Sequence, residues 1–219
     1  DAKTLNKGLT VRVDLDNVAE MQNWREVYTG RLMRRLLRNE LRRAVALLSA
    51  AATNTALTWD TSGGKDPDQD AASQVIAFQD AAGVNPTRIM YGAVAWNKRR
   101  LSHRAQNTAG GFASAGKTVQ EVAEELGLEQ GLVSKERYQS AAAVKSKVVG
   151  DIVLIYLAEA GMTPEDPSNI KRFVSPTQGG TKFRVYEQVI NAKLVDITVE
   201  HYSNIIVTST LGIQKLTIS

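Results

Sequence analysis

One stretch of the chain, from Asn17 to about Ala52, has a helical pattern and contains no proline. At ~1.5 Å per residue such a helix spans roughly 54 Å, whereas helices of compact domains usually run about 8–20 residues. Asn17 and Glu20 predict a capping box at its start. Its apolar stripe contains Met21, Trp24, Val27, Leu32, Leu36, Leu41, Val45 and Leu48. Because a helix cannot bury such a stripe alone, other parts of the chain must cover it.

A second face of this helix is basic. Arg31, Arg35, Arg38 and Arg42 follow one another at steps of four, three and four residues, which places them on one side of the helix. Two interpretations stay open. The row is either a solvated face, paired with acids such as Glu40 and with neighbouring subunits, or a surface that lies against nucleic-acid phosphates. The phosphate contacts would not depend on base sequence.

The rest of the pattern predicts an α+β fold. Residues 8–15 alternate between apolar and polar and predict a strand with one buried side. Further helices are expected over 71–82, 94–102 and 118–126, and further strands over 88–92, 131–135 and 151–158. The segments predicted as loops are 60–70, 105–117 and 137–147. The end of the chain is rich in β-branched residues and predicts strands over 183–190, 194–202, 205–209 and 213–219.

The composition and the residue spacing argue against disulfides, metal sites and catalytic sites. The chain has no cysteine, which excludes disulfides and thiolate sites, and its two histidines, His103 and His201, stand apart from other ligand-type residues. Asp66, Asp68 and Asp70 alternate as in a cation loop, but they do not complete the calcium pattern, so we expect a solvated turn before a helix that Asp70 caps. We therefore predict no catalytic, cofactor-binding or metal-binding residues, no cofactor, and a protein that is not an enzyme.

Residues 111–118, GFASAGKT, match the phosphate-loop pattern at every fixed position. In that motif Lys117 would reach the β- and γ-phosphates and Thr118 would hold Mg²⁺. The motif must follow a buried strand, however, and the polar sequence before Gly111 does not predict one. We interpret the match as a flexible loop of small residues that fits by chance.

Residues 119–136 resemble a helix-turn-helix, with Ala123, Gly127 and Val133 at its small, turn and apolar positions. Its recognition helix would carry Leu132, Lys135 and Arg137. Gly131 falls inside that helix, where it costs about 1 kcal/mol. This cost favours the simpler interpretation of one amphipathic helix followed by a short strand. A DNA-binding helix-turn-helix protein remains the alternative.

The order of elements over nearly the whole chain resembles the tailed-phage major capsid proteins, which have the HK97-type fold. KGLTVRVDLDNVAE (7–20) resembles the returning strand of that family's extended loop, and WREVYTGRLMRRLLRNELRRAVALL (24–48) resembles its spine helix. NPTRIMYGAVAWNKR (85–99) resembles an axial-domain strand and helix. The segment 166–202 resembles the strands that return to the peripheral domain. The family's N-terminal arm and outgoing loop strand have no counterpart, so we expect a chain trimmed at that end.

The resemblance implies an HK97-like capsid fold with a long spine helix, a peripheral β-rich domain and an inserted axial α/β domain. Residues 1–15 would be a remnant of the extended loop. Residues 16–57 and 176–203 would form the peripheral domain, and residues 58–175 and 204–219 the axial domain.

The same resemblance implies a major capsid protein that self-assembles into hexamers and pentamers of an icosahedral shell around double-stranded DNA. Its partners would be copies of itself, scaffold, portal or decoration proteins, and packaged DNA that the inner face contacts without sequence specificity, with no membrane. The protein would be found in the virion after assembly in the host bacterial cytoplasm. An encapsulin-type nanocompartment shell, which shares the fold, is the alternative.

Overall fold

The computed structural model describes residues 3–159, 167–177 and 180–219, and it divides into two compact units. Unit 1 comprises Asp1–Arg43 and Arg172–Ile206, and unit 2 comprises Ala44–Lys171 and Val207–Ser219. The chain therefore passes from unit 1 to unit 2, returns, and ends in unit 2. The assignment of peripheral and axial domains stays a prediction. It also takes in residues 1–2, 160–166 and 178–179, which lie outside the described residues.

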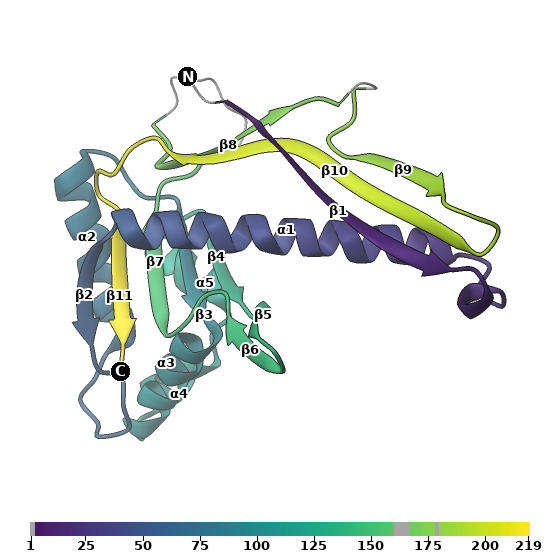
Figure 1. Cartoon of the computed structure of the whole chain (residues 1–219). Coiled ribbons are helices and arrows are strands. Elements are labelled where there is room, and N and C mark those ends of the chain that lie inside the picture. Colours follow the sequence, from purple (N-terminus) through teal and green to yellow (C-terminus); the bar gives the residue numbers. More distant parts are fainter. Residues whose placement is uncertain (1–2, 160–166, 178–179) are drawn as a thin grey trace. The chain divides into compact units, whose positions relative to one another are not determined.

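Unit 1 pairs a sheet with the first part of helix α1 (Trp24–Ala51) (Figure 1). Its central strand, β10 (Leu194–Val207), pairs antiparallel with β1 (Leu5–Asp14) and with β9 (Arg184–Val189), and β8 (Ile170–Ser175) is also its neighbour. The register sets the apolar side chains of β1 opposite those of β10. The buried core is Val13, Val18, Trp24, Leu32, Leu36, Val195, Ile197 and Val199. The predicted half-buried strand at 8–15 is thus confirmed.

The predicted capping box at Asn17 and Glu20 is wrong. A single 3₁₀ turn, η1 (Asp16–Val18), stands there, and α1 begins only at Trp24. The Leu15 amide donates to the Lys193 carbonyl at 2.8 Å, and Val18 is buried in the core of unit 1. The chain is therefore held in a turn at the end of β1 before the helix starts. From Trp24 the helix runs unbroken for 28 residues.

Unit 2 is built on a five-stranded mixed sheet. Its strand order is β2 (Thr53–Leu57), β11 (Gln214–Ile218), β7 (Ile152–Tyr156), β3 (Arg88–Gly92) and β4 (Gln130–Ser134). The two outer pairs are parallel and the inner pairs antiparallel. The central strands β7 and β3 are short apolar runs that are buried almost throughout, as expected of strands covered on both faces. The strands predicted at 88–92, 131–135 and 151–158 are confirmed, whereas β2 was not predicted.

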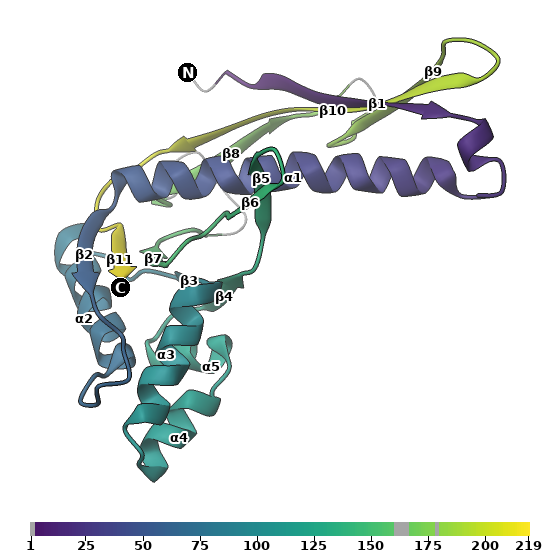
Figure 2. The ribbon, with the colours of Figure 1, turned by 60° about the horizontal axis from the view of Figure 1, so that its bottom comes forward.

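Helices α2 (Pro67–Ala82), α3 (Ala93–Ala105), α4 (Ala109–Gly116) and α5 (Val119–Glu125) belong to unit 2. α2 packs on β11 and β7, and α3 packs on β3 and β4. Figure 2 shows α4 beside α3. α2 starts four residues before the prediction because Asp66, not Asp70, caps it, with Pro67 in the first helical position. Gly83 ends it in the left-handed conformation, as its position after the helix leads one to expect.

Two segments predicted as loops are regular structure. Residues 105–117 contain α4, and residues 137–147 form a hairpin of β5 (Arg137–Ala141) and β6 (Val144–Lys147). The hairpin turns at Ala143, which has φ +60°, so the Gly or Asn that normally marks such a turn is missing. The two strands predicted at 194–202 and 205–209 are one strand, β10, because Ser203 still pairs with Leu5 of β1.

Candidate functional site

The phosphate-loop match does not form a phosphate cradle. Residues 109–116 are the helix α4, so their amides are not arranged around an anion. The Lys117 ammonium donates to the Glu125 carboxylate at 2.5 Å, and the Thr118 hydroxyl caps α5 in a capping box with Glu121. Both side chains that would serve a nucleotide are engaged in local structure. The structure thus supports the interpretation as a chance match, although the match lies on a helix and not on the expected loop.

The helix-turn-helix alternative is wrong. α5 is its first helix, but the segment that would form the recognition helix is the strand β4, paired with β3. Gly131 explains why: a Cβ there would lie 2.2 Å from the Val119 carbonyl oxygen, so β4 runs against α5 where only glycine fits. Leu132 is in this strand and Arg137 in the hairpin, and neither is presented on a helix.

The first candidate site is a buried ionic cluster in unit 1, the Glu40 cluster, which consists of Lys7, Glu40, Arg172, His201 and Ser203. The Glu40 carboxylate is only 5% exposed. Its Oε2 forms an ion pair with the Arg172 guanidinium at 2.8 Å, and its Oε1 lies 3.7 Å from the Lys7 ammonium and 3.3 Å from His201 Nε2. The Ser203 hydroxyl donates to the same Oε1 and accepts from Lys7 at 3.0 Å. One carboxylate thus joins β1, α1, β8 and β10.

The electrostatics of this cluster favour an ionised Glu40 and a neutral His201. Burial acts to raise the pKa of Glu40, but the Ser203 hydrogen bond and the charges of Arg172 and Lys7 outweigh it and hold the pKa below its ordinary value. Burial lowers the pKa of His201, since its ring is fully enclosed and lies 4.9 Å from the Phe183 ring. His201 lies in β10, and its contacts with Glu40, Ser203 and Phe183 hold unit 1 together.

The second candidate site lies in unit 2 and is called the Asp68 cluster; it consists of Asp68, Tyr91, Trp96, Arg99 and His103. Arg99 is fully buried and donates two hydrogen bonds to the Asp68 carboxylate, at 2.6 and 2.7 Å. Its guanidinium also lies 4.7 Å from the centre of the Trp96 ring, which packs edge-on against Tyr91. Burial raises the pKa of the Tyr91 phenol, and the nearby Asp68 charge acts in the same direction.

This cluster also explains why α4 is a helix. A third Arg99 hydrogen bond goes to the Ser114 carbonyl at 3.1 Å, and Arg100 donates to the Ala115 carbonyl at 3.4 Å. Two arginines of α3 therefore satisfy carbonyls in the last turn of α4, where positive charge is favourable. Gly111 lets the helices touch, because a Cβ there would lie 2.5 Å from the His103 carbonyl oxygen.

The aspartates 66, 68 and 70 are not the solvated turn that the sequence predicts. Asp66 caps α2, Asp68 binds Arg99, and Asp70 accepts a hydrogen bond from the Trp59 indole at 2.8 Å. Each carboxylate is committed to a partner in the protein. Among the described residues, no group of three or more His, Asp or Glu side chains could hold a metal ion.

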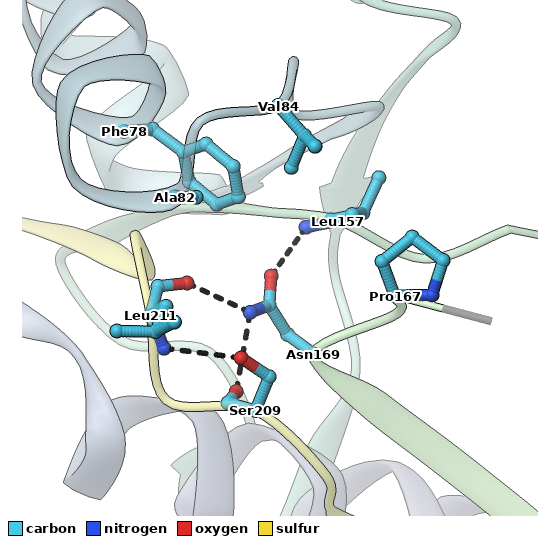
Figure 3. A pocket seen from close by; sticks show the side chains of 8 residues that line it. All are labelled: Phe78, Ala82, Val84, Leu157, Pro167, Asn169, Ser209 and Leu211. Atoms are coloured by element: carbon cyan, nitrogen blue, oxygen red, sulfur yellow. Dashed lines mark hydrogen bonds between the residues drawn. The ribbon is translucent and has the colours of Figure 1, made fainter. Parts of the chain in front are cut away.

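A shallow apolar depression of about 160 Å³ lies in unit 2 between the end of α2 and the loop before β11 (Figure 3). Asn169 stands beside it and binds the backbone on both sides. Its Oδ1 accepts from the Leu157 amide at 2.7 Å, and its Nδ2 donates to the carbonyls of Ser209 and Leu211 at 3.1 and 2.9 Å. The Asn169 amide thus fixes the loop before β11. The walls of the depression are mainly the side chains of Phe78, Ala82, Val84, Leu157, Pro167 and Leu211.

Several large apolar side chains are exposed on the described surface. All six residues of β9 are exposed, and Val189 at its end is 68% exposed. Val185 on the same strand and Ile190 just after it add to this surface. In the described part of the chain, no helix is long and apolar enough to cross a membrane. Exposed apolar side chains grouped on one strand are typical of surfaces that contact another protein.

No family model and no curated protein matches the sequence. The three-dimensional structure, however, has the HK97-like fold, as the sequence resemblance predicted, and the α+β class is confirmed. A phage-related protein from Bordetella bronchiseptica is similar with a TM-score of 0.73 at 20% identity, over 97% of this chain and 74% of that one.

Two further structures show how widely this fold is shared. The capsid of the cyanophage P-SCSP1u is similar with a TM-score of 0.60 at 10% identity, over 99% of this chain and 72% of its own. The SrpI encapsulin from Synechococcus elongatus is similar with a TM-score of 0.51 at 12% identity, over 98% of this chain and 73% of its own. At these identities the likeness establishes the fold.

Proposed function

We propose that this chain is the larger part of a major capsid protein. In this proposal it is a structural subunit that self-assembles into hexamers and pentamers of an icosahedral shell enclosing double-stranded DNA. It acts in the virion after assembly in the host bacterial cytoplasm, with copies of itself as its main partners and with scaffold, portal or decoration proteins as further ones. It has no catalytic role.

The observation that carries the proposal is the similarity of almost the entire chain to solved phage structures. The TM-scores to the Bordetella phage-related protein and the cyanophage capsid are 0.73 and 0.60, against 0.51 for the encapsulin. Phage structures make up most of the similar structures, with TM-scores from 0.52 for Mycobacterium phage Che8 upward, and an encapsulin-type nanocompartment is the second candidate. The engaged side chains of Lys117, Thr118, Glu40 and Asp68 support a structural role, since each is used to hold the fold.

The test is assembly of the full-length protein. Size-exclusion chromatography with light scattering and negative-stain microscopy should show capsomers or closed shells. Shells that contain nuclease-protected double-stranded DNA would support the capsid, whereas closed shells filled with a specific protein cargo would support the encapsulin-type alternative. A protein that stays strictly monomeric under all assembly conditions would contradict both.

The exposed end of β9 offers a sharper test. We expect Val189→Asp to reduce the yield of particles at least about tenfold, because an apolar side chain that is covered on assembly would be replaced by a charge. The folding stability of the subunit should change by less than about 0.5 kcal/mol. Gln188→Asp, the adjacent exposed position on the opposite face of the strand, is the matched control and should assemble normally. Equal assembly of both variants would show that β9 is not a subunit contact.

A further inference from the structure

The arginine row of α1 has a definite place in unit 1. At 100° per residue, Arg31, Arg34, Arg35, Arg38 and Arg42 fall within an arc of roughly 100°. The buried residues Leu32, Leu36 and Glu40 lie on the opposite side of the helix and face the sheet of unit 1. The row found in the sequence thus gains Arg34 and is the side of α1 that points away from the sheet.

The exposed charge of this face is positive. Arg31, Arg34, Arg35 and Arg42 are exposed, and Arg38 is half-buried. Arg31 lies over the Tyr28 ring, and Arg34 donates to the carbonyl of Gly30 one turn earlier. Both of these partners are uncharged, so neither contact neutralises its arginine.

The acidic residues of α1 lie away from Arg31, Arg34 and Arg35. The helix contains two of them, Glu26 and Glu40. Glu40 is buried in its cluster with Lys7 and Arg172, on the opposite side. The expectation that Glu40 pairs with the arginine face is therefore wrong. Glu26 lies in the first turn, before the row begins.

We propose that this arginine face binds the phosphates of double-stranded DNA without sequence preference. The proposal deepens the proposed function, on which it rests, by naming the surface that meets the packaged DNA. From Arg31 to Arg42 the row is ~16 Å long, a length over which one DNA strand presents about five phosphates. Guanidinium groups suit phosphate oxygens because they donate paired hydrogen bonds in a fixed plane. Charge complementarity is thus the argument for DNA as the occupant.

The experiment measures binding of the full-length subunit to a fluorescent random-sequence duplex by anisotropy, between roughly 50 and 200 mM salt. The test variant is Arg31→Gln/Arg34→Gln/Arg35→Gln, in which glutamine preserves helix propensity. Its binding should weaken at least about tenfold at the low-salt end, and the slope of log K against log salt should fall by about 2.7, which corresponds to three lost phosphate contacts. The charge-preserving variant Arg31→Lys/Arg34→Lys/Arg35→Lys should retain most of the binding.

The matched control removes the same charge elsewhere. Lys135, Arg137 and Lys145, at or near the β5–β6 hairpin, are exposed, and their triple glutamine variant should keep the wild-type salt slope. An equal loss in both triple variants would show diffuse attraction to a basic protein and would overturn the proposal. Undiminished binding by the α1 variant would also overturn it and would favour an acidic protein segment as the occupant.

Particle formation separates this proposal from the proposed function. If the α1 glutamine variant forms normal shells with less DNA inside, both proposals are supported. If shells form and their DNA content is unchanged, the arginine face is not the DNA surface, although the chain is still a shell subunit. If the wild-type protein forms no shells, the proposed function fails whatever the binding assay shows.

Discussion

Two ionic clusters of this protein hold a carboxylate in different ways: the Glu40 cluster in unit 1 buries it, whereas the Asp68 cluster in unit 2 leaves the aspartate side chain 21% exposed. Asp68 in unit 2 is neutralised by one fully buried arginine through two short, parallel hydrogen bonds, and that arginine comes from an element 31 residues away. Glu40 in unit 1 is shared by Arg172, Lys7, His201 and Ser203, the last of them 163 residues away. Its two cationic partners are partly exposed, with 34% and 18% of their side chains accessible.

The difference suggests two kinds of stabilisation. Arg99 holds Asp68 in a fixed geometry with two hydrogen bonds, and His103 Nε2 lies 3.1 Å from the same carboxylate. Removal of Arg99 therefore takes away the guanidinium charge that balances Asp68. The Glu40 cluster is distributed over more partners, so it tolerates the loss of one contact better, and the lowered pKa of its histidine makes it respond to pH. The Asp68 cluster holds neighbouring helices, whereas the Glu40 cluster ties the two ends of the chain to α1.

The largest expected effect is that of Arg99→Met. It removes the guanidinium that balances Asp68 and one of the two arginine contacts at the end of α4. We expect a loss of about 3 kcal/mol in the free energy of unfolding, the low end for a buried pair because Asp68 is partly exposed. Hydrogen exchange should accelerate most in α3 and α4. The double variant Arg99→Met/Asp68→Leu should recover part of the loss, because it removes the unpaired charge. Little change in the exchange of α4 would show that Arg99 does not hold that helix.

Glu40→Gln should have a smaller effect, about 2 kcal/mol, because solvent screens Arg172 and Lys7 in part. Urea unfolding and hydrogen exchange should place the loss in β1 and β10. The matched control is Glu26→Gln on the exposed first turn of the same helix, which should leave both measurements near wild type. If the loss equals that of Arg99→Met, the distinction between a cluster with distributed partners and one dominated by a single arginine is wrong.

The stability of unit 1 should depend on pH through His201. Because the pKa of His201 is lowered from 6.5 by burial, with Arg172 and Lys7 acting in the same direction and Glu40 against it, the unfolded chain binds this proton more readily than the folded one. Stability of unit 1 should therefore fall as the pH falls through about 6.5. Below 4.5, protonation of Glu40, whose pKa is also lowered, should add to the loss.

Hydrogen exchange of β10, corrected for the intrinsic effect of pH, checks this between about pH 5.5 and 7.5. The variant His201→Asn should flatten the dependence in this interval. Amides of β7 in unit 2, a strand that contains no histidine, serve as the internal reference. A variant with the same pH dependence as wild type would rule out His201 as the titrating group.

The smallest effect is expected at an exposed pair. Arg12 and Asp196 face each other across β1 and β10, with two hydrogen bonds of 2.8 and 2.9 Å, but 58% of the Arg12 side chain is exposed. Solvent weakens such a pair, so Arg12→Gln should not shift the thermal midpoint measurably. Double-mutant analysis with Asp196→Asn checks this. A shift comparable to that of Glu40→Gln would show that bidentate geometry matters more than burial.

Much of the fold could be predicted from local sequence signals. The apolar stripe of α1 and the apolar run of β7 identified their elements, since burial on one side or on both leaves a periodic pattern. The hairpin at Ala143 and the helix at 109–116 could not be predicted in this way. The first lacks the usual turn residue, and the second is capped by Arg99 and Arg100 from another helix.

The sequence by itself determined the long helix, its basic row and the α+β class, because periodicity over many residues depends only on local geometry. The tertiary structure alone decided which charges are buried. Lys7, Glu40, Arg172 and His201 are polar residues without a shared local pattern, and they meet because β1 and β10 pair across nearly 200 positions of the chain. Helix geometry already places Glu40 opposite the arginine row. The pairing of β1 with β10 supplies the partners among which Glu40 is buried.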